Sequence, residues 1–110
     1  MRRLYPALAL LAITATAAAA QGITVSLTEW KVELSKDTVK AGSVTFRVTN
    51  NGSMAHALYV KGAGVAKGTR DLAKGESATL TLPLKAGTYD VYCPMAEGRS
   101  EEHTSELQSR

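Results

Sequence analysis

Short segments that alternate apolar and polar side chains place the strongest limit on the fold of this chain. Every second residue in them is apolar, which is the period of a strand with one buried face. No segment keeps the apolar spacing of three and four residues over the length of a helix. The predicted strands cover residues 23–28, 44–49, 55–61, 77–82 and 88–93. Turn residues separate them, so we predict an all-β sandwich or barrel of one domain.

One extended run changes the parity of its apolar positions. Before Glu29 the apolar side chains are at odd positions, and after it they are at even positions, beginning with Trp30. We interpret this change as a bulge or bend near Thr28 and Glu29 within one strand. We also expect residues 61–76 to be mostly loop and Pro83 to end the fourth strand. Five strands are few for a closed structure, so we expect that one is missing.

The first 20 residues have the order of an export signal. Arg2 and Arg3 precede an apolar run that extends from Leu4 to Ile13, and small residues follow up to Ala20. The apolar run is about half of the roughly 20 residues that a membrane anchor needs. We therefore predict a signal peptide over residues 1–20, export to the periplasm or the exterior, and no stable membrane anchor after cleavage.

The charge of the remaining chain is close to neutral. Arg2 and Arg3 account for two of the 13 Lys and Arg residues, which leaves 11 basic side chains against ten acidic ones. A near-neutral domain without a basic stretch gives no electrostatic case for nucleic acid binding. We expect a monomer that does not bind nucleic acid.

Cys93 is the only cysteine, so it cannot form a disulfide within the chain. In an exported protein such a cysteine is a free thiol, an intermolecular bridge or a metal ligand. Cys93 shares the parity of Val91, and His56 shares the parity of Leu58, so both polar side chains should point into the sandwich near one rim. A thiolate and an imidazole there suit a metal such as copper or zinc. The alternative is a satisfied core histidine and an inert buried cysteine.

Three motifs follow one another along the chain. They occupy residues 39–50 (VKAGSVTFRVTN), 53–58 (SMAHAL) and 86–94 (AGTYDVYCP). Together they resemble the cupredoxins, in particular the small exported single-domain type, over about residues 23–98. The resemblance implies a Greek-key β-sandwich with one mononuclear copper site, in which His56 and Cys93 are two of the ligands. It also implies that a second histidine, and usually a methionine, follow the cysteine by a few residues.

The sequence departs from the cupredoxin pattern after Gly98. No methionine follows Met95, and His103 lies ten residues past Cys93, which is farther than the family's loop would place it. Met95 and His103 are therefore weaker candidates for the metal. The segment is polar and shows no closing hydrophobic strand, so we expect the C-terminal strand to be missing.

Residues 99–109 resemble the in-frame translation of a sequencing adapter. We therefore expect residues 21–98 to be the cupredoxin-like domain and residues 99–110 to be a non-native tail, with a native disordered tail as the alternative. On this basis the copper site of the 110-residue chain should be incomplete, and its copper binding weak or absent. An unpaired sheet edge should make the chain poorly stable.

The resemblance implies an exported copper-binding protein that transfers single electrons in its full-length form, with a redox partner protein. A copper carrier or metal-handling accessory protein of the same fold is one alternative, and a metal-free binding module is another. No Ser-His-acid set, phosphate loop or carboxylate pair occurs in a convincing context, so no enzyme is predicted. We expect Trp30 in the core, Met54 at the rim and Asp90 facing solvent.

Overall fold

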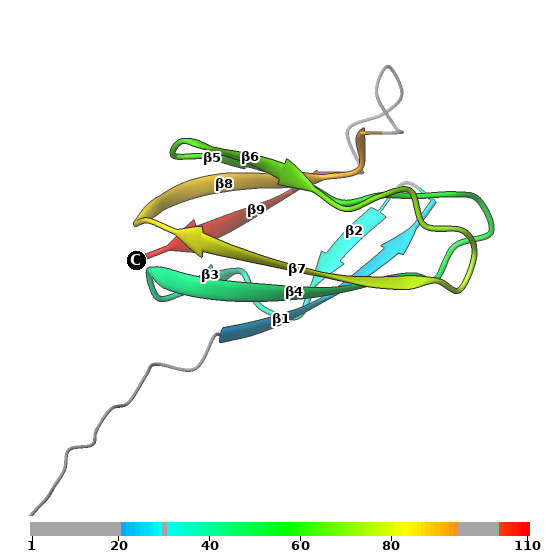
Figure 1. The fold of residues 1–110 in the computed structure, drawn as a ribbon, viewed down its shortest axis with the longest axis horizontal. Helices are drawn as coiled ribbons and strands as arrows, with labels where there is room; N and C mark the ends of the chain where they lie inside the picture. Colours follow the sequence, from blue (N-terminus) through cyan, green and yellow to red (C-terminus); the bar gives the residue numbers. More distant parts are fainter. Residues whose placement is uncertain (1–20, 30, 95–103) are drawn as a thin grey trace, which may run out of the picture.

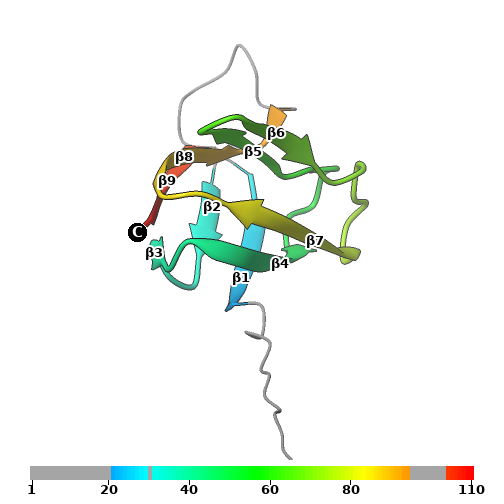
Figure 2. The ribbon, with the colours of Figure 1, turned by 60° about the vertical axis from the view of Figure 1, so that its left-hand side comes forward.

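Two β-sheets pack face to face in the computed structural model, which describes residues 21–29, 31–94 and 104–110 (Figure 1 and Figure 2). All of the regular elements in these ranges are strands, apart from short turns. The prediction of an all-β sandwich is confirmed. Within the described part of the chain there is no helix with the length and hydrophobicity to cross a membrane.

The first sheet holds four strands in the order β2-β1-β4-β7. They are β1 (Gln21–Thr28), β2 (Lys31–Leu34), β4 (Gly42–Asn50) and β7 (Ser77–Leu84). β1 and β4 are parallel, whereas β1 pairs with β2, and β4 with β7, in the antiparallel sense. Alternate residues of β4 are buried, as the period of two predicts: Val44, Phe46 and Val48.

The second sheet holds five strands in the order β3-β9-β8-β5-β6. They are β3 (Thr38–Val39), β5 (Tyr59–Gly62), β6 (Val65–Gly68), β8 (Gly87–Tyr92) and β9 (Thr104–Ser109). All of its pairs are antiparallel except β3 with β9. β8 therefore lies in the middle of the sheet, where both of its edges are hydrogen-bonded.

One continuous core fills the space between the sheets, and Tyr89 is its largest fully buried side chain. The Tyr89 hydroxyl donates a hydrogen bond of 2.7 Å to the carbonyl of Lys85. This bond satisfies the polar end of a ring that is otherwise surrounded by apolar side chains. It also ties β8, the strand just before Cys93, to the turn that precedes it.

The parity change near Glu29 comes from a hairpin, so the prediction of one bulged strand was wrong. Thr28 pairs with Lys31, so β1 and β2 form a tight hairpin, and Glu29 lies in its turn. Leu27 and Val32 then stand opposite each other and point to the same face. In a two-residue hairpin the paired residues are an odd number of positions apart. The inward side chains are therefore at odd positions in β1 and at even positions in β2. Trp30 lies outside the described residues.

Two further boundaries differ from the sequence prediction. The segment predicted as loop contains β6, which follows β5 through a turn with positive φ at Ala63 (43°) and Gly64 (83°). Alanine is uncommon at such a position, which hid the turn in the sequence. β7 continues through Pro83 because it is an edge strand, where a residue without an N–H is tolerated.

A C-terminal strand, which we expected to be missing, is present as β9. It pairs with β8 on one side, with Leu107 opposite Tyr89, and with β3 on the other. Leu107 is fully buried, and Ser105 and Ser109 occupy the other inward positions of the strand. Because only one of these three positions is apolar, the hydrophobic alternation is too weak to see. With β9 present, β8 is paired along both of its edges.

Candidate metal centre

The segment between β4 and β5 carries His56 and is held by hydrogen bonds to the loop before β7. The His56 N–H donates to the Leu72 carbonyl (3.0 Å), and the Leu72 N–H donates to the His56 carbonyl (2.7 Å). The fully buried Asn50 amide donates to the carbonyls of Met54 (2.7 Å) and Leu72 (2.9 Å), and its oxygen accepts from the Gly52 N–H (2.8 Å). His56 therefore lies just before the strand in which it was predicted, on a firmly braced segment.

Cys93 directly follows β8 and faces His56. Its Sγ lies 3.7 Å from His56 Nδ1, and each residue is 3% exposed. β5 pairs with β8, with Val60 opposite Val91 and both buried. His56 and Cys93 lie an even number of residues from these two valines, and their side chains point to the same interior. The structure thus brings together the two residues that the sequence singled out, while their role as metal ligands stays a prediction.

Glu29 is a third member of this site that the sequence did not reveal. Its Oε2 accepts hydrogen bonds from the backbone N–H groups of Ser53 (2.8 Å) and Met54 (3.0 Å), and it lies 3.0 Å from His56 Nε2. Glu29 stands in the β1–β2 turn, 27 residues before His56, and only the hairpin brings it here. No local motif in the sequence signals such a contact.

The carboxylate of Glu29 bears on which ring nitrogen of His56 carries the hydrogen. The hydrogen bond with His56, followed by the one from the Met54 backbone, lowers the pKa of Glu29 to about 2, against the opposing effect of burial. Glu29 is therefore ionised at neutral pH and accepts a hydrogen bond from Nε2–H of His56. In a neutral imidazole the lone pair is then on Nδ1, which faces the sulfur of Cys93.

The spacing of the two donor atoms fits a single metal ion. Metal bonds of about 2.3 Å to sulfur and about 2.0 Å to nitrogen can meet across 3.7 Å, at an angle of about 115–120°, as in a trigonal centre. No group of three or more His, Cys, Asp or Glu side chains suited to a metal occurs within residues 21–29, 31–94 and 104–110. Met95 and His103 lie outside these ranges. Met54 is 51% exposed, in keeping with the rim position predicted for it.

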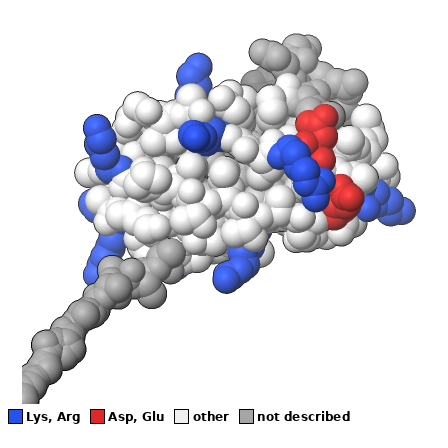
Figure 3. Space-filling view, viewed as in Figure 1, with Lys and Arg blue, Asp and Glu red and all other residues white. Residues whose placement is uncertain are grey.

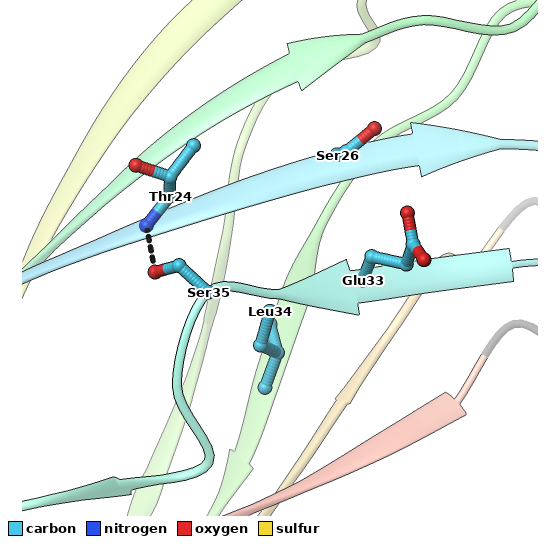
Figure 4. A pocket seen from close by; sticks show the side chains of 5 residues that line it. All are labelled: Thr24, Ser26, Glu33, Leu34 and Ser35. Carbon is cyan, nitrogen blue, oxygen red and sulfur yellow. Dashed lines mark hydrogen bonds between the residues drawn. The ribbon is translucent and has the colours of Figure 1, made fainter.

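A shallow pocket elsewhere on the first sheet offers no comparable chemistry (Figure 4). Its lining comes from β1, β2 and the residue after β2: Thr24, Ser26, Glu33, Leu34 and Ser35. The Thr24 N–H donates to the Ser35 hydroxyl (2.9 Å), and the carboxylate of Glu33 lies 3.2 Å from the ammonium of Lys31. One exposed carboxylate among hydroxyl groups provides no soft ligand for copper.

Charged side chains are dispersed on the face of the molecule shown in Figure 3. The Lys and Arg side chains on that face stand apart from one another, and large areas between them are uncharged. The predicted outward position of Asp90 in β8 is confirmed, because its side chain is exposed. The polar groups that converge in the interior are those around His56 and Cys93.

Comparisons with known proteins agree with the fold. The family model of the cupredoxin-like domain matches residues 3–101. Reduced auracyanin from the photosynthetic bacterium Roseiflexus castenholzii is 15% identical, with a TM-score of 0.63, over 84% of this chain and 99% of that one. An oxidized amicyanin mutant is 24% identical, with a TM-score of 0.60, over 80% and 81%. A Cu(I) amicyanin mutant is 20% identical, with a TM-score of 0.59, over 86% of each chain. A search of curated proteins gives no match.

Proposed function

Because this chain belongs to the cupredoxin-like family, we propose that its domain binds one copper ion and transfers single electrons. The observation that carries the proposal is the buried pair of His56 Nδ1 and Cys93 Sγ, 3.7 Å apart. A thiolate and imidazole donor set suits both Cu(I) and Cu(II). Copper bound there would supply a one-electron couple.

The protein contributes rigidity and exclusion of water. The segment of His56 is held through Leu72 and Asn50, and Cys93 directly follows β8, a strand that is paired on both sides. Donors held on such elements change position little when the charge of a bound ion changes. The same burial keeps solvent away from the sulfur and the imidazole.

We propose that the remaining two ligands belong to native sequence that residues 99–110 replace. Two serines at inward positions of β9 support this, since an apolar side chain is the usual occupant of such a position. Ser109 Oγ is buried and has no hydrogen-bond partner among the residues that the structure describes. Sequencing the 3′ end of the gene from genomic DNA tests the proposal. A histidine and then a methionine within about a dozen residues of Cys93 would complete a mononuclear site, whereas their absence would contradict it.

Export and a protein redox partner complete the proposed function. Residues 1–20 would act as the signal peptide, and the mature domain would work as a monomer in the periplasm or outside the cell, as an electron carrier and not as an enzyme. The N-terminal sequence of the protein recovered from the exported fraction should start at Gln21. An N-terminus at Met1 in that fraction would contradict cleavage.

Copper titration separates the proposal from its alternatives. We expect no intense blue absorption when Cu(II) is added to the purified 110-residue chain, and strong absorption when the tail is replaced by the genomic sequence. Cys93→Ser in the second protein should abolish the absorption, because the thiolate is its source. Intense blue colour in the 110-residue chain would contradict the incomplete site. A reversible midpoint potential against a redox partner would indicate electron transfer, whereas a copper carrier need not show one.

A metal-free binding module is favoured by one observation. His56 already has polar partners at both ring nitrogens, Glu29 and Cys93, as a structural core histidine would. In that case His56→Ala would lower stability and leave ligand binding unchanged, and neither protein would take up copper.

A further inference from the structure

The contact between Glu29 and His56 has a chemical direction that the geometry alone defines. Oε2 of Glu29 accepts from the Ser53 and Met54 backbone N–H groups, which can only donate. An oxygen that faces three nitrogen atoms, two of them obligatory donors, acts as an acceptor toward the third as well. His56 Nε2 must therefore carry the hydrogen, and the neutral ring leaves its lone pair on Nδ1.

Gly52 makes this contact sterically feasible. A Cβ at Gly52 would overlap Glu29 Oε2 and would lie 3.0 Å from His56 Nε2. Real Cβ atoms essentially never come as close as this one would to Glu29 Oε2, and the approach to the imidazole would also be tight, so the contact depends on the space left by Gly52. Since Gly52 N–H is also bonded to the Asn50 side chain, at 2.8 Å, the backbone there has little freedom to withdraw.

We propose that Glu29 is a positioning residue of the metal centre, which holds His56 in the tautomer and orientation that present Nδ1 to the sulfur of Cys93. This inference rests on the proposed function, because the value of that orientation is to form half of a copper site. A carboxylate on the outer nitrogen of a ligand histidine fixes the ring and raises its basicity, and its loss commonly lowers metal affinity 10–100-fold. A purely structural Glu29 would need only the bonds to Ser53 and Met54.

Nitrogen NMR of the metal-free protein tests this role without copper. With ¹⁵N-labelled histidine, the shifts of the neutral ring, followed through a pH titration, should show His56 with hydrogen on Nε2 and none on Nδ1. His103 is the only other histidine, so a His103→Gln variant assigns the signals. Glu29→Ala should give a mixture of tautomers, whereas Glu29→Gln, which keeps an acceptor oxygen, should restore the Nε2–H form.

Two matched controls isolate the contact. Glu33→Ala removes a carboxylate from the same hairpin, where it pairs with Lys31 at 3.2 Å, and should leave the tautomer of His56 unchanged. Gly52→Ala should disturb the tautomer although Glu29 is intact, while Gly22→Ala, whose added Cβ would meet only an ordinary contact of 3.6 Å, should not.

Copper affinity of the protein with the genomic 3′ end provides the second measurement. Glu29→Ala should lower the affinity about 10–100-fold, and Glu33→Ala should leave it as it is. A Nδ1–H tautomer in the unmodified protein, or an unchanged tautomer in Glu29→Ala, would overturn the positioning role. If the tautomers behave as expected while no variant binds copper, the positioning of His56 stands and the proposed copper function is refuted.

Discussion

Two serines on the inner face of β9 allow a sharp test of how the C-terminal strand is seated. Ser105 Oγ donates a hydrogen bond of 2.6 Å to the Val32 carbonyl across the sandwich. Ser109 Oγ is buried with no partner in the described part of the chain. The same substitution, serine to alanine, should therefore have opposite effects at positions that lie four residues apart on one strand.

The expected magnitudes follow from the hydrogen bonds. Ser105→Ala loses a bond worth about 0.5–1.5 kcal/mol, and Ser109→Ala removes a hydroxyl whose burial without a partner costs about 1–3 kcal/mol. We expect the two variants to differ by about 2 kcal/mol in the free energy of unfolding, with Ser109→Ala the more stable. For a domain of this size the difference corresponds to roughly 8–16 °C in Tm.

Thermal denaturation of the purified mature proteins, followed by far-UV circular dichroism, measures these shifts. Glu106→Ala serves as the control, because its side chain is exposed on the outer face of the same strand and should change the free energy by less than about 0.5 kcal/mol. Equal Tm values for Ser105→Ala and Ser109→Ala would show that β9 does not occupy this register. They would also contradict the pairing of Leu107 with Tyr89.

Two further predictions concern pH and β8. In the folded protein the pKa of Glu29 is about 2, mainly because of its hydrogen bond with His56, against 4.5 for the free group. The stability that this bond contributes is therefore present above about pH 4.5 and should be lost as the pH falls toward 2. Tm measured as a function of pH should show this loss, and Glu29→Gln should make Tm less dependent on pH. Tyr89→Phe should lower the free energy of unfolding by about 1 kcal/mol in urea denaturation, because the carbonyl of Lys85 loses its donor, and an unchanged midpoint would contradict that bond.

The strands that could be predicted are those whose inward side chains are uniformly apolar. β4 and β8 bury alternate residues, and the same parity predicts from the sequence that Cys93 and His56 face each other. The period of two is a local property, so it survives in the sequence wherever one face of a strand is completely hydrophobic.

The features that could not be predicted depend on contacts between distant segments. Glu29 reaches His56 only because β1 and β2 form a hairpin, and an acidic residue in a turn usually faces solvent. β9 has one apolar inward residue, Leu107. Its place in the sheet therefore depends on the backbone hydrogen bonds of its pairing with β8 and β3 more than on burial of apolar side chains. Pairing partners of this kind leave no trace in the composition of the strand itself.

The register of β8 with β9 determines where the segment between Cys93 and β9 begins and ends. Tyr92 pairs with Thr104, so the chain that leaves the sandwich at Cys93 returns beside its point of departure, at the rim where His56 stands. Any further ligand that follows Cys93 must come from this connection, because its two ends are held together by the sheet. His56, Glu29 and Cys93 are positioned by strands and by the braced segment after β4. Under the proposed function, the sandwich would therefore supply two ligands, His56 and Cys93, whatever the connection contains, and the residues between Cys93 and β9 would decide whether the site is complete.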